Sequence, residues 1–241
     1  MSPTLHNSEF LKHKSMKVLG IETSGNVGGV AICEDKHVII ANDFGAGMQH
    51  GKELIPAIRT TLHEIGWKPG DIDLIAVDVG PGSYTGLRVG VTCAKTMAYA
   101  LNKPVIDVPI FDIIAENYAI GSIPICPIID AKRNHVYACI YKQEDARRKR
   151  LSEFLVIRPE KLLSILPRPV IIFGDGVAPY REIFQQKDII IDEKGHAIPS
   201  AKYVALLGER KYESGHRCEI DKLLPLYLQR AEAIEKQEGK K

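Results

Sequence analysis

The apolar positions of this chain fall into two similar halves, each opening with a short apolar run that ends at a carboxylate. In the first half the run ends at Glu22, and in the second it ends at Asp130. Each run is followed by a polar turn and another run, which predicts an antiparallel hairpin; later runs alternate with helical patterns. This order predicts mixed sheets with helices outside. The predicted strands span residues 18–21, 27–33, 37–41, 74–79, 123–129, 136–141, 154–157 and 170–173.

The helix predicted from near Leu87 to Leu101 is apolar on two faces. A helix that packs only on its own sheet buries one row of apolar side chains, here called a stripe. A second apolar stripe therefore indicates that another surface packs against the helix. The helix predicted over 50–66 could cover that stripe, but it has one apolar face of its own to bury, and a partner protein is favoured. The first stripe comprises Leu87, Val91, Ala94, Ala98 and Leu101, and the second comprises Val89, Cys93, Thr96, Met97 and Ala100.

The loop before this helix, residues 80–86, is rich in glycine and joins a strand to a helix N-terminus. Such a junction can present backbone N–H groups to an anion, and Gly82 is the candidate contact. The loop lacks the Gly-Lys-Ser/Thr ending of a P-loop and does not fit the dinucleotide fingerprint. A purely geometric role is favoured over phosphate binding.

Glu22 and Asp130 are candidate Mg²⁺-nucleotide ligands, because a carboxylate at a strand end beside a polar turn suits a hydrated cation. The turn after Asp130 has no glycine to let a phosphate approach, which weakens this hypothesis. Gly174 and Gly176, which follow a predicted strand, could flank an adenosine or simply form a strand-to-helix turn.

The amino-acid composition narrows the kinds of protein that this chain can be. The chain has 241 residues, 45% of them hydrophobic, so it can bury a large core. Its net charge of +2 gives no strong positive electrostatic potential that would by itself attract nucleic acid. Five isolated cysteines predict reduced core residues of a cytoplasmic protein. No apolar run is long enough to span a membrane. One basic run, residues 147–150, is either a solvated loop or a phosphate-backbone contact.

Four motifs carry a family resemblance. Residues 80–90 read GPGSYTGLRVG, residues 18–24 read VLGIETS, residues 130–137 read DAKRNHVY, and residues 225–228 read PLYL. The chain resembles the bacterial TsaB (YeaZ) family over roughly residues 16–231. The first two motifs are shared by TsaB and its paralogue TsaD, whereas the last two resemble TsaB alone.

The resemblance implies a two-lobed α/β protein with the actin/hexokinase-like (ribonuclease H-like) fold. It implies a non-catalytic dimerisation and scaffold subunit that binds the TsaD transferase, which makes N6-threonylcarbamoyladenosine beside the tRNA anticodon. A TsaE-like ATPase would join the pair, and TsaC would supply threonylcarbamoyl-AMP. The chain would contact tRNA indirectly and could form a homodimer when alone. We expect no resident cofactor or metal, with ATP or ADP only within the complex. The expected partner-interface residues are Arg88, Val89, Cys93, Thr96, Met97 and Ala100.

Two enzyme hypotheses compete with this one. The transferase itself requires a metal held by two histidines at i, i+4, but Ile110 and Ile114 stand where that pair is expected. A small ATPase or kinase of the actin-like superfamily would use Glu22 and Asp130 at a Mg-nucleotide site. The division expected from the sequence is a flexible extension over 1–15, an N-terminal dimerisation lobe over 16–108, a C-terminal lobe over 109–230 and a charged tail over 231–241.

Overall fold

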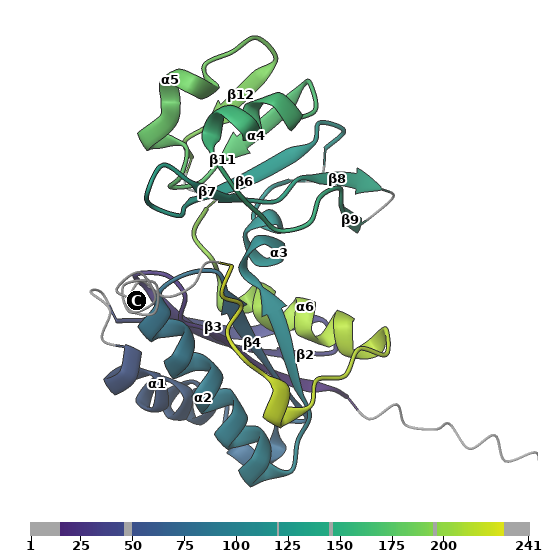
Figure 1. Cartoon of the computed structure of the whole chain (residues 1–241). Coiled ribbons are helices and arrows are strands. Elements are labelled where there is room, and N and C mark those ends of the chain that lie inside the picture. The colour runs from purple at the N-terminus through teal and green to yellow at the C-terminus, as the bar shows by residue number, and fades with distance from the viewer. Residues whose placement is uncertain (1–14, 46–49, 120, 145–146, 195–196, 229–241) are drawn as a thin grey trace, which may run out of the picture.

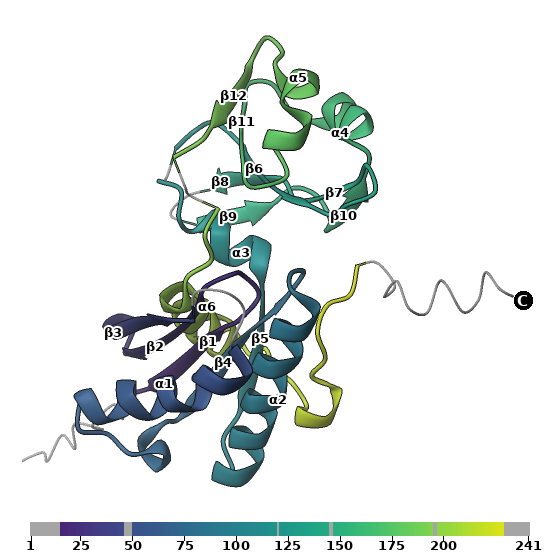
Figure 2. The same ribbon diagram turned by 90° about the vertical axis from the view of Figure 1, so that its left-hand side faces the viewer.

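The structure is a computed structural model that describes residues 15–45, 50–119, 121–144, 147–194 and 197–228. The chain forms two lobes, one above the other in Figures 1 and 2, with helix α3 (Ile110–Ala115) at their junction. The tail expected over 231–241, and the extension expected over 1–15 apart from Ser15, lie outside the described residues.

The first lobe is built on a mixed five-stranded sheet in the order β3-β2-β1-β4-β5. β2 runs antiparallel to β1 and β3, and β4 runs parallel to β1 and β5. This hairpin followed by parallel strand–helix units is the ribonuclease H-like arrangement that the sequence predicts. Its strands are β1 (Lys17–Glu22), β2 (Gly28–Glu34), β3 (His37–Phe44), β4 (Leu74–Gly80) and β5 (Val105–Pro109).

Helices cover both faces of this sheet. One face carries α1 (His50–Glu64) and α2 (Tyr84–Leu101), whose apolar residues join Leu19, Ile75 and Val77 in one core. The other face carries α6 (Ala201–Glu213), which packs on β1, β2, β4 and β5. Small residues permit this close approach, because a Cβ added at Gly208 would lie 2.3 Å from the Cβ of Ala76.

The second lobe contains seven strands, with the order β10-β7-β6-β11-β12 and the β8–β9 hairpin attached to β6. Its core lies between this sheet and two short helices. The mixed sheets and flanking helices confirm the predicted fold class. The remaining elements are β6 (Ile125–Asp130), β7 (Val136–Ala138), β8 (Tyr141–Glu144), β9 (Arg147–Arg150), β10 (Leu155–Ile157), β11 (Val170–Phe173), β12 (Ile189–Asp192), α4 (Pro159–Ile165), α5 (Arg181–Phe184) and three 3₁₀ turns, η1 (Pro69–Asp71), η2 (Ala178–Tyr180) and η3 (Ile220–Lys222).

Several elements differ from the sequence prediction at their ends, and three of the differences bear on the site. Helix α2 begins at Tyr84, before Leu87, because the Ser83 hydroxyl accepts a hydrogen bond from the Gly86 amide and caps the first turn. The strand predicted over 136–141 is divided into β7 and β8, which both pair with β6 but have different second partners, β10 and β9. The basic run is neither a loop nor wholly solvated: it forms strand β9 of a hairpin.

The last part of the chain returns to the first lobe. After α6, Cys218 forms an isolated bridge with Val105, and the amide of Leu226 donates to the Val79 carbonyl over 2.7 Å. The described residues of the expected C-terminal lobe therefore contribute to both lobes, and the junction after residue 108 does not separate two independently packed units.

Candidate functional site

A groove with a volume of about 570 Å³ lies between α1 and α2 on the outer side of the first lobe. It is mostly apolar, and Ile55 on its α1 wall is 58% exposed. Exposed apolar side chains around a groove are typical of protein-binding surfaces. The groove is lined by Gly51, Leu54, Ile55, Tyr84, Thr85, Arg88, Val89, Thr92, Cys93, Thr96 and Met97.

The second stripe of α2 lies in and beside this groove. Val89, Cys93 and Met97 are half-buried against the first-lobe core, whereas Thr96 and Ala100 are exposed. Burial raises the pKa of the Cys93 thiol to about 11, so this thiol stays neutral near pH 7. Helix α1 thus covers the stripe only in part, and an uncharged surface remains open.

Arg88 sits at one end of the groove in a small aromatic cluster. Its guanidinium lies 4.0 Å from the centre of the Tyr84 ring, and its Nε donates to the Tyr227 hydroxyl over 3.2 Å. The Tyr84 and Tyr227 rings are 5.2 Å apart. Tyr227 comes from the returning C-terminal segment, so sequence spacing alone could not place it here.

The glycine loop packs on the β1–β2 turn. The Ser83 amide donates to the Ser24 carbonyl over 2.8 Å, and the Thr23 hydroxyl donates to the Gly86 carbonyl over 2.8 Å. A Cβ added at Gly82 would lie 2.7 Å from the Cβ of Ser24. The loop's glycines therefore allow close contact between two backbone segments.

We expect Gly86→Ala to lower the free energy of unfolding by about 1 to 3 kcal/mol, because the new Cβ meets a fixed backbone atom. That Cβ would lie 2.0 Å from the Thr23 carbonyl oxygen. Urea unfolding measures the change. Gly70→Ala, with no atom within 4 Å of its added Cβ, is the control. Equal stability of the two variants would contradict this packing role.

Glu22 is buried beneath this loop, with 1% of its surface exposed, beside a second carboxyl that the sequence analysis did not single out, Asp78. Glu22 accepts a 2.6 Å hydrogen bond from the Ser24 amide, and Asp78 accepts a 2.7 Å bond from the Gly80 amide. Burial, and then the charge of Asp78, raises the pKa of Glu22; burial raises the pKa of Asp78 to about 6.

The pair is best described as a protonated Glu22 that donates to an Asp78 carboxylate. Such a proton supplies a partner for Asp78 Oδ2, a buried atom that otherwise has none within the described residues. As packed, the carboxyl of Glu22 holds the base of the loop together and does not face solvent.

Asp130, Gly174 and Gly176 lie together in the second lobe. Asp130 bonds Lys132 Nζ over 2.6 Å; burial opposes ionisation, but this partner lowers the pKa of Asp130. A Cβ added at Gly174 would lie 2.0 Å from the Ile128 carbonyl oxygen, and the Gly176 amide donates to that same oxygen over 3.1 Å. Both glycines therefore sit tightly against the end of β6.

Ile110 and Ile114, the positions at which the sequence analysis expects a transferase to carry its metal-binding histidines, lie on α3. They are 5% and 1% exposed and pack in the apolar cluster at the lobe junction. Across the described ranges, no group of three or more His, Cys, Asp or Glu is placed to hold a metal ion. None of the helices in those same ranges combines the length and apolarity that crossing a bilayer requires.

Comparison with known proteins agrees with this architecture. The family model for TsaD, tRNA N6-adenosine threonylcarbamoyltransferase, matches residues 44–237. The tRNA threonylcarbamoyladenosine biosynthesis protein TsaB of Bacillus subtilis is 29% identical over 232 residues, which are 90% of this chain and 96% of that protein. The structure of YeaZ from Pseudomonas aeruginosa superposes with a TM-score of 0.78 at 25% identity, covering 88% of this chain and 100% of that one.

The family match spans the glycine loop, α2 and the whole second lobe, and the TsaB relative is matched along nearly its whole length. The resemblance inferred from the four motifs is thereby confirmed. This chain belongs to the TsaD-type family and, within it, to the TsaB (YeaZ) group.

Proposed function

We propose that this chain is a non-catalytic scaffold subunit in N6-threonylcarbamoyladenosine biosynthesis, and that it binds and activates a TsaD-type transferase. The observation that carries the proposal is the mostly apolar groove between α1 and α2, with Arg88 as its one charged lining residue among those described, in a chain whose TsaB relative is named for this pathway. A partner helix laid between α1 and α2 would bury Val89, Cys93 and Met97 and pack on Thr96 and Ala100. Arg88 would lie at the rim.

Two features support a non-catalytic role. Ile110 and Ile114, at the positions expected for the metal-binding pair, are apolar core residues. Glu22, the first carboxylate of the alternative ATPase hypothesis, is buried and engaged with Ser24. Bond formation is thus assigned to the partner transferase, and this chain holds it in a competent arrangement.

The family also implies the other proteins with which this chain would work. A TsaE-like ATPase would join the pair in the cytoplasm, with threonylcarbamoyl-AMP supplied separately, and ATP or ADP would bind only within the assembly. In the absence of the transferase, the same groove would let two copies of this chain associate as a homodimer.

Depletion of this protein is expected to lower threonylcarbamoyladenosine in cellular tRNA several-fold, because the transferase loses its scaffold. Nucleoside mass spectrometry of a depleted strain, with and without a plasmid-borne copy of the chain, measures the change. Unchanged modification in the depleted strain would refute the proposal. ATP turnover by the purified chain, lost in Asp130→Asn, would instead support the kinase or ATPase alternative.

A further inference from the structure

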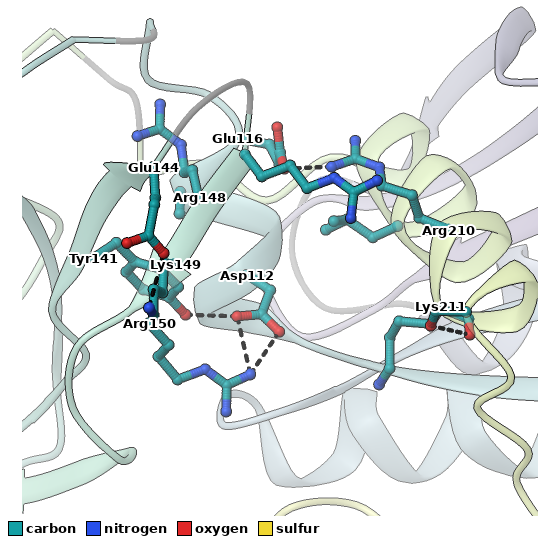
Figure 3. A pocket seen from close by; sticks show the side chains of 13 residues that line it. Asp112, Glu116, Tyr141, Glu144, Arg148, Lys149, Arg150, Arg210 and Lys211 are labelled. Carbon is teal, nitrogen blue, oxygen red and sulfur yellow. Dashed lines mark hydrogen bonds and ion pairs between the residues drawn. The ribbon is translucent and has the colours of Figure 1, made fainter.

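Two adjoining hollows of about 680 and 530 Å³ lie at the junction of the lobes, where α3, the β8–β9 hairpin and α6 meet. Figure 3 shows the side chains that line the larger hollow. Both hollows are lined by Glu116, Arg147, Arg148 and Arg210, so they form one continuous depression, the basic trough. It involves none of the residues of the α1–α2 groove.

Cations outnumber acids in the basic trough. Asp112 pairs with Arg150 over 3.0 Å and Glu116 with Arg210 over 3.2 Å, as Figure 3 shows. Two further cations, outside these pairs, are also matched by carboxylates: Lys149 by Glu144 and Lys211 by Asp107. The cations of the trough that form no ion pair in the described ranges are Arg147 and Arg148, although the nearby charge of Glu116 favours the cation of Arg148.

Arg148 is held in place by main-chain atoms. Its Nη2 donates to the carbonyl oxygens of Tyr118 and, over 3.2 Å, Ala119. Burial lowers the pKa of Arg148, which reflects a cation held in a poorly solvated position. A guanidinium has five N–H donors, and within the described residues Nε and Nη1 of Arg148 have no acceptor. The neighbouring Arg147 is exposed, with no partner in those residues. The site thus offers two guanidinium groups to an anion.

We infer that the basic trough binds the phosphodiester backbone of RNA. Guanidinium groups match phosphate oxygens in charge and in forked geometry. A single phosphate would occupy a small part of the two hollows, whereas a stretch of backbone can run along them. Tyr203 and Tyr118, whose ring stacks on Phe173 with one face, also line the trough and provide aromatic surface of the kind on which unpaired bases stack. The inference rests on the proposed function, in which tRNA is the substrate of the assembly.

The test is fluorescence anisotropy of a labelled, unmodified tRNA transcript titrated with the full chain at several salt concentrations. Arg147→Glu is expected to weaken binding on the order of ten-fold at low salt and to reduce the slope of log affinity against log salt by about one. Arg158→Glu, the same charge reversal at an exposed position outside the trough, is the matched control and should bind as the parent chain does.

A second variant removes the bidentate guanidinium of Arg148 and keeps its positive charge. Arg148→Lys is expected to weaken tRNA binding while leaving the thermal transition near that of the parent chain, because a lysine cannot make bidentate phosphate contacts. No tRNA binding by the parent chain at low salt, or equal binding by Arg147→Glu, would overturn the inference. Displacement of tRNA by inorganic phosphate or AMP at matched phosphate concentration would show a small phosphate ligand and would also overturn it.

The outcomes separate this inference from the proposed function. If depletion lowers tRNA modification but Arg147→Glu binds tRNA normally, the trough assignment fails alone. If depletion leaves modification unchanged, the proposed function fails whatever the trough binds.

Discussion

Thr96→Glu is expected to weaken association with a TsaD-type transferase at least about a hundred-fold. Thr96 is exposed on α2 and lines the α1–α2 groove, so the free chain can solvate the new carboxylate. In the proposed complex the same carboxylate would be enclosed without a cation, which costs several kcal/mol on the order of its effective desolvation penalty. Co-purification with the transferase and isothermal titration measure the loss.

The matched control is Thr60→Glu, which places the same side chain on an exposed position of α1 outside the groove. Circular dichroism should show both variants folded. Normal binding by Thr96→Glu would place the interface elsewhere. Unfolding of Thr96→Glu would show that this part of the stripe is internal core and would remove the basis of the partner assignment.

Asp78→Asn is expected to change how stability depends on pH. The pKa of Asp78 is raised from 3.8 to about 6 by burial, so between these values the folded chain keeps a proton that the unfolded chain releases. The free energy of unfolding of the parent chain therefore loses a contribution as pH rises through this window. The variant has no such loss. Its stability relative to the parent should increase by roughly 3 kcal/mol from about pH 4 to about pH 7.

Denaturant unfolding of both chains at a series of pH values gives this difference directly. Asp221→Asn removes an exposed carboxyl from the 3₁₀ turn η3 and is the control. The effects of acidic groups far from Asp78 cancel in the comparison. The pKa of Glu22, which the charge of Asp78 raises in the parent, falls in the variant and changes the difference in the same direction. A difference between Asp78→Asn and the parent that stays constant with pH would show that Asp78 is ionised throughout.

The first lobe could be predicted closely because its signals are local. The apolar run predicted over 74–79 forms β4, Leu74–Gly80. The predicted hairpin, whose first strand ends at Glu22, is also present. The carboxyl pair could not be predicted in the same way, because it depends on register between distant strands. β1 and β4 pair in parallel with Ile21 opposite Val77, which brings Glu22 and Asp78 together. The available signal was one acid inside an otherwise apolar strand.

The second lobe shows where local patterning stops being informative. Residues 136–141 are almost continuously apolar, yet β7 pairs with β10 and β8 with β9. The arginine run of β9 has the composition of a solvated loop. It becomes a strand because the hairpin partner β8 and the carbonyls near Ala119 supply its hydrogen bonds. In both cases contacts remote in sequence decide the local conformation.

The return of α6 to the first sheet has a consequence for how the protein is made. Until residues 201–213 have left the ribosome, the face of the sheet that contains Val18, Leu74 and Ile106 has no cover. The second lobe is therefore an insertion that is synthesised before the first lobe can complete its packing. A nascent chain stopped at residue 108 would expose an apolar sheet face, and such intermediates are prone to aggregation. The amino-terminal lobe, although begun first, is the one whose folding is completed last.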